Sequence, residues 1–450
     1  MPAHTDDSAT VLKHGLILPD PETGQVFAHG ATVITGDRLA EVNVQEQSAP
    51  HGARVLDCRG CLIMPGLVNA HTHAAMSLLR GIADDLPLDR WLNEYMFPAE
   101  SRHANEEFVR LGTMLSAAEM ALAGITTFAD GYFHMEQAAD AARQVGLRAV
   151  IAQGILDVPA PDAPEPGTWK RRAESFLDLC PRDSLVTPGL FCHSAYLCAP
   201  QTLKAARELA SRHGLRLFCH VAETEWEVRE IRIRYGCTPV ELLASHGLLG
   251  PDFVAVHCVH LSEADQDVLA RTGTPVVHCP ESNMKLASGA APVWNLIRRG
   301  VTVAIGTDGP ASNNNLDLIE EMRTAALMAK LVTRDPEALD ARTLLRMATT
   351  NGARALGMDH RIGSLEPGKL ADITILDLSK PHLLPLYDPV SHLVYSARGS
   401  DVRDVFVGGR QIVQSGKLVT VDQEALAEQV GKVAAEIGRE LGVRFPQRVA

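Results

Sequence analysis

The chain has 450 residues, with 42 lysines and arginines against 55 aspartates and glutamates, for a formal net charge of −13. This charge and the lack of a basic run argue against a nucleic-acid partner. An apolar fraction of 46% is typical of a globular protein. The sequence contains no run of about 18 apolar residues, the length that a membrane-spanning helix needs. The N-terminal residues do not resemble a secretory signal, so we expect a cytoplasmic protein.

The two ends of the chain have the same character. Short β-like pieces with Gly and Asp turns fill Ala9–Asp57, and similar pieces fill Ala371–Val421. Neither flank is large enough to bury a core alone. We therefore predict that both ends meet in one small β-sandwich domain, formed by residues 1–65 and by residues 366–450, which include a closing helix over Asp422–Leu441.

Eight short apolar runs alternate with helical stretches between these flanks. The runs are Gly66–His73, Gly124–Gly131, Arg148–Asp157, Leu185–Ser194, Leu215–Glu223, Phe253–Leu261, Pro275–Asn283 and Val301–Gly309. Their spacing suits one strand plus one crossover helix. We predict an α/β fold, a (β/α)8 TIM barrel over residues 66–365, with the active site at the C-terminal ends of its strands. A doubly wound open sheet is the alternative.

A polar residue lies near the end of each predicted strand. These residues are His73, Asp130, Asp157, His193, His220, His257, His278 and Asp308. Cys192, Cys219, Cys258 and Cys279 adjoin four of the histidines, so alternation along a strand predicts that these cysteines face the outer helices. The nine cysteines are scattered and odd in number, which favours free thiols.

His71 and His73 form an H-x-H pair whose side chains share one face of the first strand. His220 ends the fifth strand and Asp308 ends the eighth. Three imidazoles and one carboxylate suit a single divalent ion, zinc with iron as the competitor. Such an ion lowers the pKa of a bound water toward neutrality. Satisfied core polar groups are the structural alternative.

Two further residues are candidates for proton transfer. Glu223 lies three residues after His220, at the rim of the barrel, where its carboxyl can reach a substrate atom beside the metal. His257 ends the sixth strand and could orient the activated water, whose proton Asp308 could also accept. A solvated rim carboxylate and a core histidine are the plain alternatives for Glu223 and His257.

The segments PGLVNAHTH, HVAE, AVHCVHL, HCPESNMKLASG and GTDGPASNNNLD resemble the amidohydrolase superfamily. The most similar members are its 5′-methylthioadenosine/S-adenosylhomocysteine deaminases, and the likeness runs nearly end to end. It implies an enzyme that hydrolytically deaminates an adenine nucleoside, so the binding partner is a small molecule rather than a nucleic acid or a membrane. It also implies that the enzyme is a homo-oligomer. Binuclear members carry a lysine at the end of the fourth strand, where this chain has His193, which favours one metal ion per subunit.

The resemblance also assigns residues. His71, His73, His220 and Asp308 match the metal ligands, and Glu223 and His257 match the proton-transfer pair. Glu223 would protonate N1 of adenine, activated water would add at C6, and ammonia would leave. Four residues match or suit substrate contacts: Glu100 at the ribose hydroxyls, His193, Trp91 at the base or ribose, and Arg171 or its neighbour Arg172.

One departure from the family concerns the 5′ substituent. Members often have arginine in the third strand, where this chain has Gln153. A guanidinium there would pair with the amino-acid carboxylate of S-adenosylhomocysteine. We therefore favour 5′-methylthioadenosine or adenosine as substrate. The alternatives are a guanine or 8-oxoguanine deaminase, a triazine hydrolase, and a non-catalytic barrel scaffold.

Overall fold

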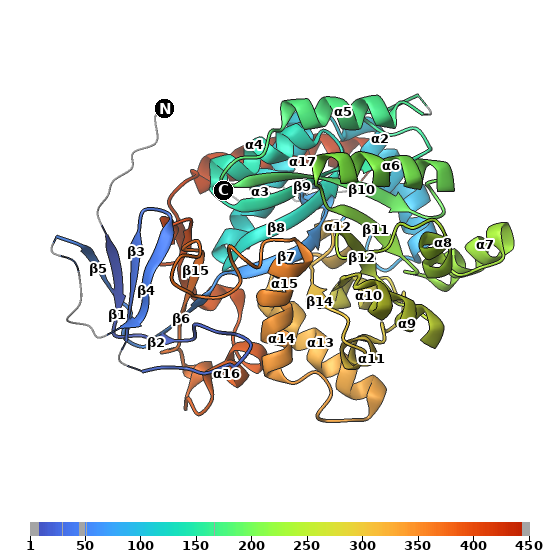
Figure 1. Cartoon of the computed structure of the whole chain (residues 1–450). Coiled ribbons are helices and arrows are strands. Elements are labelled where there is room, and N and C mark those ends of the chain that lie inside the picture. The colour runs from blue at the N-terminus through green and yellow to red at the C-terminus, as the bar shows by residue number, and fades with distance from the viewer. Residues whose placement is uncertain (1–8, 29, 45–49, 51, 166, 443–450) are drawn as a thin grey trace.

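A computed structural model of the chain describes residues 9–28, 30–44, 50, 52–165 and 167–442. Its largest sheet has eight parallel strands in the order β14-β13-β12-β11-β10-β9-β8-β7. The strands are β7 Leu67–Thr72, β8 Ile125–Tyr132, β9 Arg148–Ile155, β10 Val186–Ser194, β11 Leu217–Val221, β12 Phe253–His257, β13 Val276–His278 and β14 Val303–Ile305. This arrangement confirms the predicted (β/α)8 barrel (Figure 1).

Hydrogen bonds between β7 and the segment after β14 close the barrel at the two ends of the pairing order. The Asp308 N–H donates to the carbonyl of His71 at 3.1 Å. The Asn69 side chain donates to Thr307 Oγ1 at 2.8 Å and accepts from the Thr307 N–H at 3.1 Å. The closure therefore brings the end of the first strand and the segment after the last strand together.

The interior of the barrel is a packed apolar core. Its strands contribute Val68, Ala70, Ala129, Val150, Ala152, Phe191, Phe218, Val254, Val256, Val277 and Ala304 to one buried cluster, which also includes Cys279 directly after β13. Cys192, Cys219 and Cys258 pack into the outer cluster with the helices, as predicted. The prediction for Cys279 was wrong: it follows β13 and lies in the inner cluster together with Val277 of that strand.

Helices surround this barrel (Figure 1). Asn105 caps α3 by accepting from the Phe108 N–H, and Ser262 and Asp265 form a capping box at α9. The helices after the barrel strands are α1 Leu88–Arg90, α2 Phe97–His103, α3 Glu106–Leu122, α4 Met135–Val145, α5 Trp169–Leu179, α6 Pro200–His213, α7 Glu225–Tyr235, α8 Pro239–Ser245, α9 Glu263–Thr272, α10 Pro280–Lys285, α11 Val293–Arg298, α12 Pro310–Asn313, α13 Leu318–Thr333, α14 Ala341–Met347 and α15 Thr350–Ala355.

Two smaller sheets lie beside the barrel and use both ends of the chain, as predicted (Figure 1). One contains β4 Arg38–Val44, β3 Ala31–Thr35, β1 Thr10–Lys13 and β5 Arg54–Asp57. The other contains β18 Lys417–Leu418, β17 Arg410–Gln414, β16 Val402–Val407, β15 Ile373–Asp377, β6 Cys61–Pro65 and β2 Leu16–Ile17. Leu12 and Ile34 of the first sheet share a buried cluster with Ile63 and Ile373 of the second. The division at residues 65 and 365 stays a prediction.

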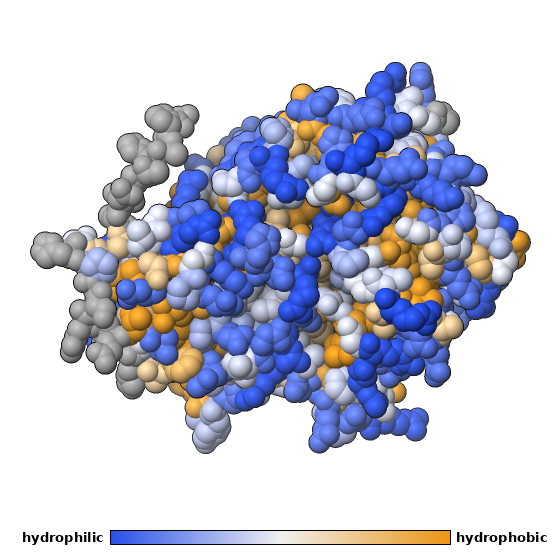
Figure 2. Space-filling view, viewed as in Figure 1, coloured by the Kyte–Doolittle hydropathy of each residue, from blue (hydrophilic) through white to orange (hydrophobic). Residues whose placement is uncertain are grey.

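The C-terminal part of the chain returns to the barrel. After the helix α16 Pro389–Tyr395 and strands β16 to β18, the helix α17 Gln423–Glu440 packs against α3. The face in Figure 2 is mostly hydrophilic, with apolar side chains showing between the outer helices. Among the described residues, no helix has the length and apolar character needed to cross a membrane.

Candidate metal centre and active site

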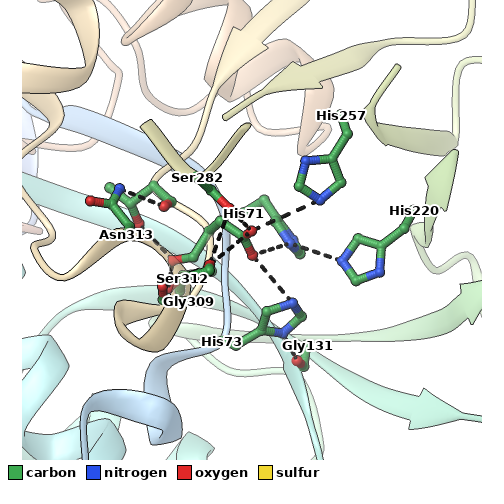
Figure 3. Close-up of polar contacts among 12 residues, drawn as sticks. His71, His73, Gly131, His220, His257, Ser282, Gly309, Ser312 and Asn313 are labelled. Atoms are coloured by element: carbon green, nitrogen blue, oxygen red, sulfur yellow. Dashed lines mark hydrogen bonds and ion pairs between the residues drawn. The ribbon is translucent and has the colours of Figure 1, made fainter. Parts of the chain in front are cut away.

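Four predicted ligands converge at the C-terminal end of the barrel, and Figure 3 shows the three histidines among them. One ligand atom from each of His71, His73, His220 and Asp308 lies within 4.8 Å of the others. The Nε2 atoms of His71 and His220 are 3.3 Å apart. Asp308 Oδ1 lies 3.4 Å from Nε2 of both His71 and His73. The donors therefore face a common point.

The protonation states of these side chains suit a cation. Burial lowers the pKa of His71 to about 4 and that of His220 well below its usual value, so both rings are neutral and offer lone pairs. Burial alone would raise the pKa of Asp308, but its bond to His71 and the neighbouring imidazoles hold it well below its usual value. A carboxylate together with three imidazoles is a donor set that fits zinc or ferrous iron.

His73 is held with its free ring nitrogen toward this cluster. Its Nδ1 lies 2.6 Å from the carbonyl oxygen of Gly131, to which it donates. Because a neutral imidazole carries one N–H, this bond leaves the lone pair on Nε2, which faces Asp308. Such a bond from the second nitrogen is usual for histidines that bind metals.

The backbone at the site adopts unusual conformations. His257 has a φ of 71° and Asp308 a φ of 58°, both in the left-handed region that L-residues seldom occupy. Both residues lie where the chain leaves a barrel strand. Strain of this kind persists only where surrounding bonds fix it, and it is concentrated at functional sites.

Glu223 and His257 lie beside the ligand cluster. His257 Nε2 is 3.9 Å from Glu223 Oε2 and 3.9 Å from Asp308 Oδ2. Burial raises the pKa of Glu223. Burial lowers the pKa of His257, but the carboxylates of Glu223 and Asp308 outweigh this effect and raise it overall. A carboxyl whose pKa is raised, next to an imidazole, is placed to deliver a proton to a substrate.

The sequence interpretation missed Glu227, which holds this segment. Its carboxyl accepts from the N–H groups of Ala222 at 3.0 Å and Glu223 at 2.9 Å. Glu227 is buried, and burial raises its pKa to about 7. The signal was present in the sequence, because Thr224 and Glu227 have the spacing of a capping box at the start of α7.

A cavity of about 640 Å³ opens over the cluster, and Glu100, Trp91 and His193 line it together with Glu223 and His257. Trp91 begins a π-helical turn, Trp91–Met96, that leads into α2 and Glu100. Burial lowers the pKa of His193 to about 3, so its ring is neutral.

Glu100 has a partner that the sequence could not reveal. Its Oε1 accepts from the hydroxyl of Tyr132, at the end of β8, at 2.8 Å. Burial raises the pKa of Glu100 to about 7. Because water screens this carboxyl only weakly, a polar group that binds beside it should change its pKa strongly.

The structure does not bring Arg171 to the cavity. Trp169 and Ala173 face the core from α5, which turns Arg171 to the solvent. The neighbouring Arg172 donates to Asp162 at 2.8 Å and also pairs with Glu136. The expectation that Arg171 contacts the substrate therefore has no support in its placement.

Comparison with known proteins places this geometry in a family. Residues 62–412 match the sequence profile of the amidohydrolase family. The chain belongs to the amidohydrolase family. Its relatives include a 5-methylthioadenosine/S-adenosylhomocysteine deaminase of Syntrophobacter fumaroxidans, 47% identical over 95% of this chain and 98% of the relative. A 5′-deoxyadenosine deaminase of Methanothermobacter thermautotrophicus is 45% identical, covering 91% of this chain and 95% of the relative.

Solved amidohydrolase structures have the same fold. An adenosine deaminase from Xanthomonas campestris with bound zinc has a TM-score of 0.93 and 38% identity, over 96% of this chain and 99% of that one. A zinc complex of atrazine chlorohydrolase from Arthrobacter aurescens has a TM-score of 0.89 at 24% identity, over 94% and 100%, and supports the fold alone. The predicted resemblance and the aminohydrolase class are confirmed.

Proposed function

We propose that this amidohydrolase removes the 6-amino group of adenine nucleosides by hydrolysis, releasing ammonia and the inosine-type product. One observation carries the proposal: a single cavity is lined by His73, His220 and Asp308 of the ligand cluster, by the acid–base pair and by Glu100. The deaminase names of its relatives, at 47% and 45% identity, support the same substrate class.

His71, His73, His220 and Asp308 would hold one divalent ion, for which we favour zinc over iron. When bound, such an ion lowers the pKa of a water to about 7 and so supplies a nucleophile at neutral pH. Glu223, whose pKa is raised by burial, would give a proton to N1 and make C6 electrophilic. Water adds to C6, and His257 Nε2 or Asp308 accepts its proton. The proton then passes to the amino group, the C6–N bond breaks with loss of ammonia, and the proton of the C6 hydroxyl returns to Glu223 as the C6 carbonyl forms.

Glu100 supports a nucleoside rather than a free base. A carboxylate can accept hydrogen bonds from two vicinal ribose hydroxyls, which a purine or triazine base lacks. In our proposal, ribose hydroxyls bind to the Glu100 oxygen that Tyr132 does not occupy. Trp91 and His193, which line the same cavity, contact the base and ribose.

The cavity walls favour an uncharged 5′ substituent. Among the described residues that line the cavity, none is lysine or arginine. Its outer wall includes Val158, Pro159 and Leu197, whereas Arg172 is held by Asp162 and Glu136. The carboxylate of S-adenosylhomocysteine would find no cation here, so 5′-methylthioadenosine and adenosine fit better.

An ammonia-release assay tests the proposal. We expect turnover of 5′-methylthioadenosine and adenosine, a lower kcat/KM for S-adenosylhomocysteine, and no turnover of guanine or melamine. Turnover restricted to guanine, 8-oxoguanine or triazines would refute the nucleoside assignment. Turnover of none of these substrates by metal-loaded protein would favour a non-catalytic scaffold.

Metal content, assembly and location are tested separately. Elemental analysis should give one equivalent of zinc or iron per subunit, and less than half an equivalent after reconstitution would count against the metal centre. Assembly into a homo-oligomer, a cytoplasmic location and the absence of a nucleic-acid partner stay predictions, the first of which light scattering tests.

A further inference from the structure

The helix α10, Pro280–Lys285, reaches the active site with two consecutive side chains that the mechanism above leaves without a role. Ser282 and Asn283 are both 0% exposed. They follow β13, at the same end of the barrel as the ligand cluster. One side chain contacts Asp308 and the other contacts His257. This short helix therefore contacts both side chains that are placed to accept the proton of water.

Ser282 fixes the orientation of the Asp308 carboxylate. Its hydroxyl donates to Asp308 Oδ2 at 2.6 Å, and Ser312 Oγ lies 3.2 Å from the same oxygen (Figure 3). Asp308 Oδ1 instead points to His71 and His73 at 3.4 Å. The two carboxylate oxygens thus have separate partners, and rotation about the last side-chain bond would break the short bond to Ser282.

Asn283 fixes the tautomer of His257. Its Oδ1 lies 3.0 Å from His257 Nδ1. A carboxamide oxygen can only accept, so the N–H of the neutral ring lies on Nδ1 and the lone pair on Nε2. Nε2 is the atom that faces Glu223 and Asp308 at 3.9 Å. The opposite tautomer would present an N–H to the same place and could not accept a proton.

We propose that Ser282 and Asn283 are positioning residues for the deamination reaction: Ser282 orients Asp308 for the metal ion, and Asn283 holds His257 in the tautomer that accepts a proton. The inference about Asn283 rests on the proposed function, whereas that about Ser282 rests only on the ligand cluster. Outer partners of this kind change metal affinity by about 10- to 100-fold when removed.

Substitutions at Asn283 separate positioning from packing. Asn283→Leu keeps the branched shape and the number of side-chain heavy atoms but cannot accept a hydrogen bond, and we expect its kcat to fall by about 100-fold, with KM and zinc affinity within about threefold of wild type. Asn283→Asp keeps an acceptor and should retain kcat within about tenfold. Equal losses in both variants, or an unchanged kcat in Asn283→Leu, would overturn this role. Asn283→Ala carries the same expectation as Asn283→Leu if the latter does not fold.

The zinc affinity of Ser282→Ala tests the second role without any assay of turnover. We expect competition with a chelator to show an affinity at least about tenfold weaker than wild type. Met284→Ala is the matched control, because Met284 lies on α10 but is 55% exposed, and it should change neither zinc affinity nor kcat. Unchanged zinc affinity in both Ser282→Ala and Ser282→Ala/Ser312→Ala would refute the role of Ser282. Failure of wild type to deaminate nucleosides would refute the proposed function but leave this measurement valid.

Discussion

Glu223 Oε2 and His257 Nε2 lie 3.9 Å apart, so the proposed acid and base face one another across the mouth of the barrel. Burial acts on the two groups in opposite senses: it raises the pKa of the carboxyl and, taken alone, lowers that of the imidazole. Their mutual attraction moves the pKa of His257 up again. Groups whose protonation depends on each other in this way titrate as a pair, and a substrate that enters between them meets both.

Replacing the proposed acid, Glu223, should remove proton delivery to the substrate but leave metal and product binding nearly unchanged. We expect Glu223→Gln to lower kcat by about 100-fold or more, because Gln keeps the shape of the side chain but has no acidic proton. Metal content and the affinity for the inosine-type product should stay within about threefold of wild type. Glu225→Gln, which changes an exposed carboxyl two residues away, is the control. A kcat near that of wild type would show that Glu223 is not the acid.

Two buried histidines at strand ends should differ in their effect on metal. His220 points to the ligand cluster at the end of β11, so His220→Ala should lose most of the bound metal. His278 ends β13 and is equally buried, but it does not belong to the cluster. His278→Leu should therefore keep a full equivalent. Elemental analysis after reconstitution decides the matter, and equal metal loss in both variants would contradict the assigned ligand set.

The barrel and its ligand set could be predicted because they follow from local chemistry. Polar residues such as His220 and Asp308 directly follow apolar, strand-like runs, and parallel strands bring such positions to one end of a barrel. Imidazoles and a carboxylate then limit the candidate metals. Strand order and residue type narrowed the candidates to the residues at strand ends, and the resemblance to the amidohydrolases then matched His220 and Asp308, but not His278, to metal ligands.

The remaining features of the site depend on tertiary contacts, on strand register and on the rotation of helices about their axes, none of which a single sequence shows. Tyr132 reaches Glu100 only because a π-helical turn and α2 fold back over the barrel. Cys279 faces inward together with Val277, and this could not be predicted because β13 has only three residues, too few to show which face is buried. The phase of α5 decides that Arg171 faces solvent. An error of one position reverses the side of a strand or turns a helical residue by more than a quarter turn.

A buried ion pair should dominate the link between barrel and sandwich. Arg148, in β9, donates through Nε to Asp372 Oδ2 at 2.8 Å and through Nη2 to Oδ1 at 3.0 Å, and both side chains are 2% exposed. Asp372→Asn leaves the guanidinium buried without a countercharge and should cost about 3 to 5 kcal/mol in urea unfolding. Arg148→Met/Asp372→Leu should recover much of this loss.

A surface pair provides the control for that measurement. Glu428 and Lys432 of α17 lie 2.8 Å apart, and their side chains are 69% and 72% exposed. Glu428→Gln should leave the urea midpoint unchanged, because solvent screens exposed pairs. A loss in Asp372→Asn no greater than in Glu428→Gln would show that the buried pair does not hold the two parts together.

Glu100 should make the stability of the protein depend on pH. Burial raises its pKa from 4.5 to about 7, so the folded protein keeps a proton that the unfolded chain releases. The resulting stabilisation is complete below about pH 4.5 and disappears as the pH rises through about 7, and it amounts to no more than about 3 kcal/mol. Glu100→Gln stays neutral, so wild type should lose stability relative to this variant between about pH 5 and 8 in urea unfolding. Glu94→Gln is the control for this measurement, because Arg90 lowers the pKa of the Glu94 carboxyl and keeps its titration below this range. Parallel stability curves for wild type and Glu100→Gln would mean that the Glu100 carboxyl is already ionised at the acidic end of the range, despite its burial beside Tyr132.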